Sequence, residues 1–587
     1  MVHARYPAVR GARAGRALRG SAILLVVAFL IASFPRVQAV SGVVRDIEGT
    51  PLTGAVVRVK ATQTSTLTDA AGRFSLEGFS PALRVRVTAW RDGHHIGGAD
   101  AWPWNSALDL VLSPHPQVDE TEYAWQPPAV AGRSALANWV TQRSLDLTAA
   151  VSVDGLFKPV SDRLELGCRD CHASIYRDWG ESAHALGPTN ERFMTMYNGT
   201  NVHGEQSPPT RFATNREYGR VPMSPDPSQT YYGPGFKLDF PDIAGNCATC
   251  HLPTLVAEDT PYADPNQSFG VHEQGTHCDF CHKTSAVVLN PQTGSPYPNR
   301  SGILGVELMR STEPGLFFGP YDDVDFGRDT YSPLFAQSAA CASCHSASFW
   351  GVPIYQSFDE WQTSPYAAEG TTCQKCHMAP DGITTNIAPH RGGVERDPRT
   401  ISTHRFPGAS DDALLQGAAE LNVVVLRDDA RLLVEVSVTN SGAGHHLPTG
   451  SPLRQMLLVV SATDERGRVL PLEEGATLPA WAGDLAGTPG AYFAKLLEQL
   501  WTGQMPTAAY WTPTRIAEDS RLPARATRTS HYTYAASGSG KVTVDARLIL
   551  RRAYDELAEQ KGWPSADVLM AQEVVSLSGV SPSSAGS

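Results

Sequence analysis

Cysteine and charge are both scarce in this chain, and each shortage excludes a class of protein. Ten cysteines among 587 residues are too few for a small disulfide scaffold. Charged residues make up 18% and hydrophobic residues 42%, and this balance indicates neither bulk disorder nor a multi-span membrane protein. The length exceeds that of one ordinary core, so we expect several domains.

Long apolar runs are also missing, apart from one near the N-terminus. The uncharged run of residues 21–34 follows five arginines and precedes Val37-Gln38-Ala39, a small-x-small cleavage site. We therefore interpret residues 1–39 as a secretory signal peptide, with an uncleaved N-terminal anchor as the alternative. An exported protein is expected, in the periplasm or at the cell surface, with no membrane span after signal cleavage.

Acidic residues outnumber basic ones in the remainder of the chain. The formal net charge of −12 becomes −18 when the six arginines of residues 1–39 are removed. This sign disfavours nucleic acid and anionic membrane surfaces as partners, and it suits basic redox partner proteins. The oligomeric state stays open.

The ten cysteines form five C-x-x-C pairs, and a histidine follows each pair directly. The five motifs are Cys168/Cys171/His172, Cys247/Cys250/His251, Cys278/Cys281/His282, Cys341/Cys344/His345 and Cys373/Cys376/His377. C-x-x-C-H is the attachment signature of haem c, in which both thiols bond to the porphyrin and the histidine binds iron. We therefore predict five covalently attached haem c groups. Zinc and redox dithiol sites are the alternatives, but they do not require histidine at the same offset five times.

The sixth ligand of each iron decides what that haem can do. Two strong ligands favour electron transfer, whereas an open position allows a small molecule to bind. The predicted ligands are His184, His404 and His445. Further candidates are His203, His272, His277, His390 and His446. For every candidate, a surface or hydrogen-bonded histidine is the alternative interpretation.

The motifs are unevenly spaced, and the spacing indicates a duplication. The gaps between first cysteines are 79, 31, 63 and 32 residues, so two two-haem units and one additional haem are predicted. Residues 176–185 also parallel residues 358–367 in the pattern aromatic-x-acid-Trp-x-x-Ser-x-x-Ala. At one position the first copy has His184 and the second has Tyr366. Tyr366 could pack, donate a proton near an open iron, or bind iron itself.

Alternation of apolar and polar residues predicts β-structure on both sides of the motifs. Residues 40–114 are expected to form a small β-sandwich, followed by a connector over 115–164. Residues 165–412 hold the five haems, with short helices and much irregular structure. A second β-sandwich is predicted over 413–576, and 577–587 is a disordered tail. The acidic stretch 321–325 could bind calcium or form a solvated loop.

The first β-region resembles a known family. Residues 49–59, from Gly49 to Val59, and residues 68–76, from Thr68 to Leu76, resemble the carboxypeptidase regulatory-like domain. That resemblance implies a spacer or contact module without catalysis.

The haem region resembles a second family. The five motifs, with Trp179 to Ala185, Gly275 to His282 and Cys373 to Met378, look like multihaem c-type cytochromes in the broad group of the nitrifiers' tetrahaem cytochrome. The resemblance covers about residues 165–450. It implies mostly bis-histidine haems in close-packed arrays that relay electrons. Tyr366 departs from the pattern, and five proximal histidines argue against the pentahaem nitrite reductases, which have a lysine at one position.

The leading functional hypothesis is an exported pentahaem cytochrome that carries single electrons between redox partners. One alternative is an oxidoreductase acting on a small nitrogen or sulfur compound at one open haem, motivated by Tyr366. Another is a surface or filament component that conducts electrons, motivated by the two β-domains. An electron-transfer protein is favoured over an enzyme, so no catalytic residue is assigned.

Overall fold

A computed structural model describes most of the chain. The described residues are 39–78, 84–102, 107–130, 166–217, 219–258, 262–312, 315–389, 393–536, 540–564 and 567–578. Residues 1–38 of the predicted signal peptide, most of the predicted connector and most of the predicted tail lie outside them, so these predictions stay predictions. Within the described ranges, no helix is long and apolar enough to cross a membrane.

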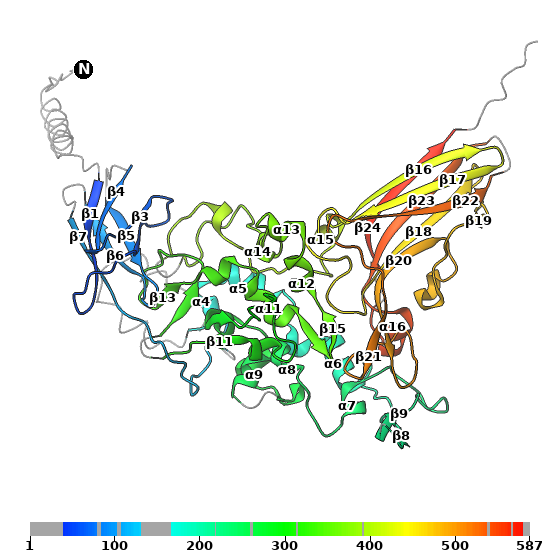
Figure 1. The fold of residues 1–587 in the computed structure, drawn as a ribbon, viewed down its shortest axis with the longest axis horizontal. Helices are drawn as coiled ribbons and strands as arrows, with labels where there is room; N and C mark the ends of the chain where they lie inside the picture. Colours follow the sequence, from blue (N-terminus) through cyan, green and yellow to red (C-terminus); the bar gives the residue numbers. More distant parts are fainter. Residues whose placement is uncertain are drawn as a thin grey trace, which may run out of the picture. The chain divides into compact units, whose positions relative to one another are not determined.

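Contacts within the chain divide it into two compact units (Figure 1). The first unit is Met1–Val118 with Ser311–Ser332, and the second is Asp119–Arg310 with Pro333–Ser587. The first unit therefore includes a segment that the sequence analysis placed in the haem region.

The first unit contains a sandwich of two sheets. Its strands are β1 (Ala39–Asp46), β2 (Val56–Val59), β3 (Ser65–Leu67), β4 (Arg73–Glu77), β5 (Val85–Trp90), β6 (Gly97–Ala101) and β7 (Ala107–Leu112). They are ordered β4-β1-β7 and β3-β2-β5-β6. Buried and exposed residues alternate along β4 and β7, because successive side chains of a strand point to opposite faces. The buried side chains of the strands form one core, which includes Val40, Val57, Leu76 and Leu110.

The segment 311–332 is tied to this unit by ion pairs. It carries the two short parallel strands β12 (Phe317–Gly319) and β13 (Asp329–Tyr331). Between them, Asp322 pairs with Arg58 at 2.7 Å, and Asp325 pairs with Lys60 and Arg86 at 2.6 Å each. These carboxylates are neutralised by protein cations, so the calcium-binding interpretation of residues 321–325 is wrong.

The central part of the second unit consists of short helices and hairpins. The helices are α4 (Cys168–Cys171), α5 (Ala173–Gly180), α6 (Glu191–Asn198), α7 (Phe236–Asp239), α8 (Ala248–His251), α9 (Pro253–Glu258), α10 (Cys278–His282), α11 (Ala339–His345), α12 (Ser357–Gln362), α13 (Pro365–Ala368) and α14 (Cys373–His377). The hairpins are β8 (Phe212–Asn215) with β9 (Gly219–Pro222), β10 (Thr284–Val287) with β11 (Val306–Leu308), and β14 (Ala347–Phe349) with β15 (Val352–Tyr355). Short helices are what the sequence predicted for this region.

The C-terminal part of the second unit is a two-sheet structure. Its elements are α15 (Asp412–Gln416), β16 (Glu420–Asp428), β17 (Arg431–Thr439), β18 (Gln455–Asp464), β19 (Leu472–Glu474), β20 (Gly490–Gln499), β21 (Thr514–Asp519), β22 (Thr527–Ala535), β23 (Val542–Arg551), α16 (Asp555–Lys561) and β24 (Val568–Leu577). The sheets are ordered β16-β17-β22-β19 and β21-β20-β18-β23-β24. One core contains buried residues of both sheets, among them Val434, Val436, Leu458 and Leu548. The alternation predicted for β17 and β23 is observed.

Candidate functional site

All five C-x-x-C-H motifs begin or complete a helical turn. The clearest cases are α10 and α14, each of which runs from the first cysteine to the histidine. Residues three and four apart lie on one face of a helix, so the two thiols and the imidazole of a motif share that face. All ten cysteines are free thiols, and none is used in a disulfide.

The thiols line spaces inside the protein. Nine of the ten cysteines are partly accessible to solvent, and only Cys376 is classed as exposed. Burial nevertheless raises the pKa of Cys247 and of Cys281 to about 12 each. A thiol can be partly accessible and still have a pKa raised by burial if its accessible surface faces an enclosed space rather than bulk solvent. A covalently held porphyrin requires such a cradle, so the cysteines fit this group.

Thiols from different motifs lie beside one another. Cys168 interacts with Cys278, Cys250 with Cys344, and Cys341 with Cys373, and these contacts raise the pKa of Cys168, Cys250 and Cys341. Cys281 also lies close enough to Cys344 for that thiol to raise its pKa, after the larger effect of burial. These contacts join all five motifs into one connected cluster.

Several imidazoles are oriented by backbone carbonyl groups. The Nδ1 atom of His172 lies 2.8 Å from the Ile387 carbonyl oxygen, and that of His377 lies 2.7 Å from the Pro407 oxygen. His445 has the same arrangement, with Nδ1 at 3.0 Å from the His446 oxygen. Donation from Nδ1 leaves Nε2 free, which is the usual arrangement of a histidine that binds a metal.

Two pairs of imidazoles are separated by the distance that a shared iron requires. The ring centres of His377 and His445 are 6.3 Å apart with planes inclined by 14°, and those of His184 and His345 are also 6.3 Å apart, inclined by 86°. Two metal–nitrogen bonds of about 2 Å, plus about 1 Å from each nitrogen to its ring centre, give about 6 Å. Both pairs therefore fit a bis-histidine iron.

Four further histidines have buried ring nitrogens without a hydrogen-bond partner among the described residues, namely His95, His277, His404 and His446. Both nitrogens of His277, and Nδ1 of His404, are buried without a hydrogen-bond partner. Burial lowers the pKa of each ring to about 3, and His282, followed by His172, contributes to the shift of His404. A buried polar group without a partner is costly, so these nitrogens point to a ligand.

His277 was only a secondary candidate in the sequence analysis. It lies directly before an attachment motif, where its counterpart in the second copy is Thr372. This difference between the two copies was the signal that could have singled it out.

The remaining candidates have other surroundings. His272 is held at both nitrogens, with Nδ1 at 3.0 Å from Thr254 and Nε2 at 3.0 Å from Glu258. His203 is exposed, and His446 faces Glu360 at 3.9 Å. His390 lies outside the described residues. His272 is thus the candidate whose hydrogen bonds argue most directly against metal binding.

His251, the proximal histidine of the second motif along the chain, has aromatic neighbours. Its ring stacks on Phe193, with centres 3.8 Å apart and planes within 3°. Near its motif, the Tyr355 hydroxyl donates to the Tyr510 hydroxyl at 2.8 Å. Burial raises the pKa of both phenols, to about 12 for Tyr355, and charge on the Cys247 and Cys250 thiols adds to the effect. Tyrosines therefore lie beside the attachment cysteines of this motif.

The predicted duplication is visible in matching hydrogen bonds. The Trp179 indole donates to the Thr276 carbonyl at 3.0 Å, and the Trp361 indole donates to the Thr371 carbonyl at 2.8 Å. The two threonine amides donate to equivalent carbonyls, that of Thr276 to His184 at 2.9 Å and that of Thr371 to Tyr366 at 2.8 Å. Each threonine follows a glycine with positive φ, Gly275 at 65° and Gly370 at 69°. His184 and Tyr366 thus occupy equivalent positions in the two copies.

Tyr366 has a structural role in this arrangement. Its hydroxyl donates to the Ser441 carbonyl at 2.5 Å, and the Arg525 guanidinium lies 4.9 Å from its ring centre. Of the three interpretations of Tyr366, these contacts support packing: it supports the loop that carries His445.

Buried polar groups hold the same loop in place. The Asn440 amide donates to the His445 carbonyl at 2.8 Å and to the Leu522 carbonyl at 3.0 Å. Glu360 accepts from the Thr449 hydroxyl at 2.6 Å, from the His446 amide at 3.2 Å, and from Arg521. Burial opposes ionisation of Glu360, but the charge of Arg521 and these hydrogen bonds outweigh it and lower its pKa. The loop is therefore fixed from several sides.

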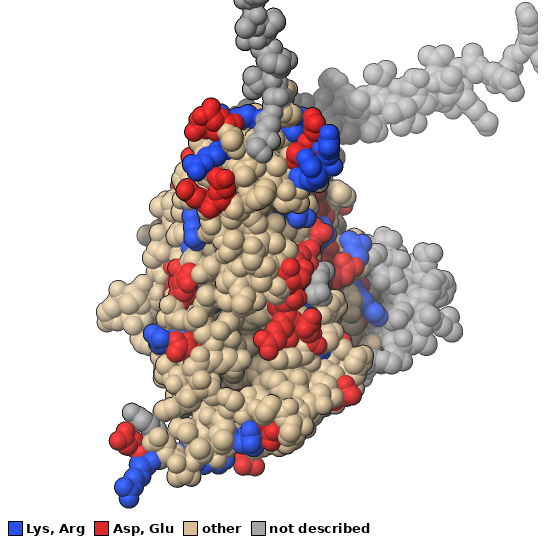
Figure 2. Space-filling view, turned by 90° about the vertical axis from the view of Figure 1, so that its right-hand side faces the viewer, with Lys and Arg blue, Asp and Glu red and all other residues tan. Residues whose placement is uncertain are grey.

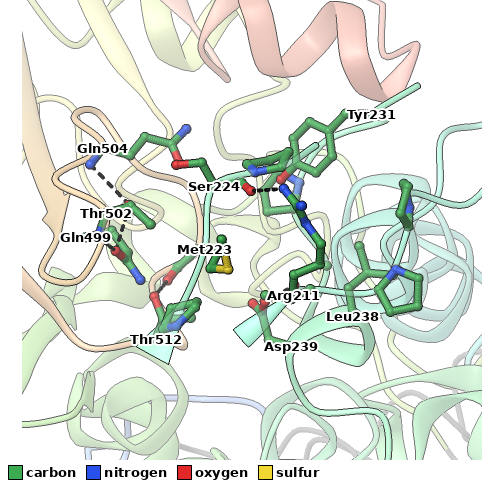
Figure 3. A pocket seen from close by; sticks show the side chains of 18 of the residues that line it. Arg211, Met223, Ser224, Tyr231, Leu238, Asp239, Gln499, Thr502, Gln504 and Thr512 are labelled. Atoms are coloured by element: carbon green, nitrogen blue, oxygen red, sulfur yellow. Dashed lines mark hydrogen bonds between the residues drawn. The ribbon is translucent and has the colours of Figure 1, made fainter. Parts of the chain in front are cut away.

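A separate cavity of about 260 Å³ lies between the β8–β9 region, α7 and the loop 499–512 (Figure 3). Asp239 on its wall accepts from Thr210 at 2.5 Å and from the Trp511 indole at 2.7 Å, and burial raises its pKa. The cavity is lined by neither cysteine nor histidine. It is therefore distinct from the haem motifs.

Comparisons with known proteins concern two parts of the chain. Residues 39–99 match the model of the carboxypeptidase regulatory-like domain. The family predicted for the N-terminal β-region is thereby confirmed. None of the curated proteins matches the chain. Among solved structures, a penta-heme cytochrome c552 from Thermochromatium tepidum is similar with a TM-score of 0.47 and 21% identity, over 70% of this chain and 97% of that chain.

Proposed function

We propose that this chain is a multihaem c-type cytochrome that carries single electrons between redox partners. The observation that carries the proposal is the cluster of five attachment motifs whose thiols contact one another. Haem c supplies a reversible one-electron couple at each motif. The chain contributes the covalent anchors, the axial imidazoles and the enclosing walls that exclude water. Contact between motifs favours electron passage from one to the next.

The ligand set follows from the imidazole positions. The proximal ligands proposed are the histidines of the five motifs. His184 is the distal ligand opposite His345, and His445 is the distal ligand opposite His377, on the basis of their ring separations. His404, whose Nδ1 is buried without a hydrogen-bond partner, is proposed as a further distal ligand.

His277 is assigned opposite His172. The neighbouring residue Cys278 contacts Cys168 of that motif, and the buried nitrogens of His277 need a partner. This residue adds a fourth distal histidine to the three that the sequence singled out.

The proposal is tested by counting haems on the mature protein. Denaturing mass spectrometry is expected to show the mass of five covalent haems. The Cys373→Ala/Cys376→Ala double variant is expected to retain four, because its other eight cysteines are intact. A mature protein that retains fewer than five haems would contradict the proposal.

A second candidate function is oxidoreduction of a small nitrogen or sulfur compound at one open haem. It is favoured by the surroundings of His251, because none of the proposed distal histidines is assigned to its iron while Tyr355 and Tyr510 lie beside Cys247 and Cys250. Carbon monoxide is expected to bind one haem of the reduced protein, and the oxidised protein is expected to show one high-spin signal. Purely low-spin spectra without carbon monoxide binding would leave only the electron-transfer function.

We propose basic redox proteins as partners and an exported location. The partner proposal rests on the net charge of −12 of the whole chain. On the face shown in Figure 2, charged side chains of both signs are present, and acidic ones gather on one side of the middle. Electron transfer to a basic partner should therefore slow as ionic strength rises, because salt screens the attraction.

A further inference from the structure

Arg454 and Arg552 lie directly beyond the ends of two paired strands, β18 and β23. Gln455 of β18 is paired with Arg551 of β23 in an antiparallel ladder, so one further step of that register places Arg454 opposite Arg552. Like charges directly opposite each other destabilise a pair of strands. Burial lowers the pKa of Arg454, and the charge of Arg552 lowers it further. The two guanidinium groups are therefore close enough to repel.

A third arginine reaches the same place from α6. Arg192 lies in the first turn of that helix, where a cation is unfavourable because the helix dipole is positive there. Burial lowers the pKa of Arg192 to about 10, with further lowering by Arg552 and Arg454 and a smaller opposing effect of Glu191. The residues next to these arginines, Phe193, Leu453 and Ala553, pack in one core, so three positive charges from separate elements lie in the same part of the second unit.

The hydrogen bonds of this cluster are incomplete. Arg454 donates to the Thr449 carbonyl at 2.9 Å, and Arg192 donates to the Pro564 carbonyl at 3.3 Å. Nε of Arg552 is buried without a partner. The adjacent Arg551 differs, since its guanidinium binds both Asp484 and Asp567. Among the described residues, none of the three clustered arginines forms an ion pair of this kind.

The cluster lies beside two attachment motifs. The charge of Arg454 acts on the pKa of Tyr355 and on that of the proximal histidine His345. Tyr355 in turn responds to Cys247 and Cys250. The core that contains Leu453 and Ala553 also packs against Cys247, so the cluster lies near the motif of His251.

We propose that Arg192, Arg454 and Arg552 form a binding site for an anion of carboxylate or oxoanion chemistry. Planar guanidinium groups bind such anions through paired hydrogen bonds, and an anion at this place would relieve the repulsion among them. The inference rests on the proposed function, because one source of the anion is a haem propionate. The other source is a small oxoanion from solution, such as nitrite.

The test uses the holoprotein and its Arg454→Met and Arg552→Met variants. Arg515→Met is the matched control, because Arg515 is exposed and paired with Glu498. Two measurements are made on each protein: the midpoint potentials of the haems, and the visible spectrum during titration with nitrite.

Each source of the anion predicts its own result. If the anion is a propionate, both variants lower the midpoint potential of a haem in the absence of added anion, because a positive charge that favours the reduced form is lost. If it is a free oxoanion, nitrite gives a saturable spectral change, and its apparent Kd rises at least about tenfold in the variants, since a charge-assisted hydrogen bond contributes about 1.5–3 kcal/mol. The control should match the wild type in both measurements.

The inference is overturned if both variants and the control have wild-type potentials and nitrite titrations. Haem counting separates this failure from failure of the proposed function, which would leave fewer than five haems on the wild-type chain. Arg454→Lys preserves the charge and loses the paired hydrogen bonds, so it serves if a methionine variant does not fold. An Arg454→Lys variant with an unchanged nitrite titration would also contradict a site for a free oxoanion, because lysine cannot replace paired recognition. Its midpoint potentials should match those of the wild type, because the charge is kept.

Discussion

The proposed iron ligands differ from other histidines in the hydrogen bonds of their ring nitrogens. His172, His377 and His445 each have Nδ1 next to a backbone carbonyl, which leaves Nε2 available. His272 has both nitrogens engaged by side chains. His277 has both nitrogens buried without a partner. The hydrogen bonds of each ring thus show which nitrogens are available, and they support the proposed ligands together with the distances between rings.

The role of His445 is tested with its neighbour His446 as the matched control. We expect His445→Ala to convert one haem from low spin to high spin and to create a site that binds carbon monoxide, because the iron opposite His377 loses its distal ligand. His446→Ala should leave the spin state unchanged. Electron paramagnetic resonance and carbon monoxide difference spectra measure both. Conversion in the His446 variant instead would reverse the assignment.

Tyr366 is expected to affect stability without affecting coordination. Tyr366→Phe removes the hydrogen bond to the Ser441 carbonyl, and the free energy of unfolding should fall by about 1 kcal/mol. The spin state of every haem should remain that of the wild type. Urea unfolding and optical spectra provide the measurements. A changed spin state with unchanged stability would indicate that Tyr366 acts on an iron.

At the scale of elements, buried lysines join segments that are distant in the sequence. Lys561 at the end of α16 is fully buried, and its Nζ lies 2.7 to 3.1 Å from the carbonyl oxygens of Thr195, Thr200 and Pro234. Lys495 of β20 donates to the carbonyls of Pro353 and Ile354. These contacts fasten the C-terminal sheets to the central helices and hairpins within the second unit.

Lys561 should make stability depend on pH. Burial lowers its pKa to about 7 from the ordinary lysine value of 10.5. Between these values the unfolded chain holds a proton that the folded chain has lost, so the free energy of unfolding rises with pH, by at most about 1.4 kcal/mol per unit. Below about pH 7 both states are protonated and this contribution is constant.

Substitution of Lys561 tests this dependence. In Lys561→Met, the free energy of unfolding should no longer show this rise between pH 7 and 10. Lys541→Met, at an exposed position, should retain the rise. Urea unfolding at several pH values gives the slopes. Equal slopes in the wild type and in Lys561→Met would refute the assignment.

At the scale of the whole molecule, residues distant in the chain are brought together in both units. In the second unit, thiol contacts link all five motifs. In the first unit, segment 311–332 contributes Asp322, Asp323 and Asp325 to the β-sandwich, where Asp323 accepts from the Ala61 amide at 2.7 Å. The domain between residues 40 and 114 is thus completed by a later part of the chain.

Asp325 should be important for the stability of the first unit. Its side chain is 5% exposed and pairs with two cations, so Asp325→Asn should lower the free energy of unfolding by about 3–5 kcal/mol. Asp109 pairs with Arg45 but is 57% exposed, so Asp109→Asn should cost less than about 1 kcal/mol. Differential scanning calorimetry compares the two variants. Equal losses would show that the pairs with Asp325 are not buried in solution.

The sequence by itself determined the local features of this protein. A C-x-x-C-H motif places its thiols and imidazole within five consecutive residues, so attachment and proximal ligation can be predicted without knowledge of packing. Alternation along β4, β7, β17 and β23 is equally local, because successive side chains of any strand point to opposite faces. The matching stretches around Trp179 and Trp361 revealed the duplication for the same reason.

Only the tertiary structure decided which distant residues meet. His445 reaches the motif of His377 from a loop between β17 and β18, and His184 reaches the motif of His345 from another part of the chain. His272 and His277 both lie shortly before the same attachment motif, so the sequence does not show that the ring nitrogens of His277 lack hydrogen bonds while those of His272 have them. Tyr366 and the aspartates of 321–325 had chemically reasonable ligand roles until their partners were known. Distal ligation and ion pairing depend on contacts between residues that are distant in the chain. Such contacts produce no repeating pattern in the local sequence, so they could not be predicted from it.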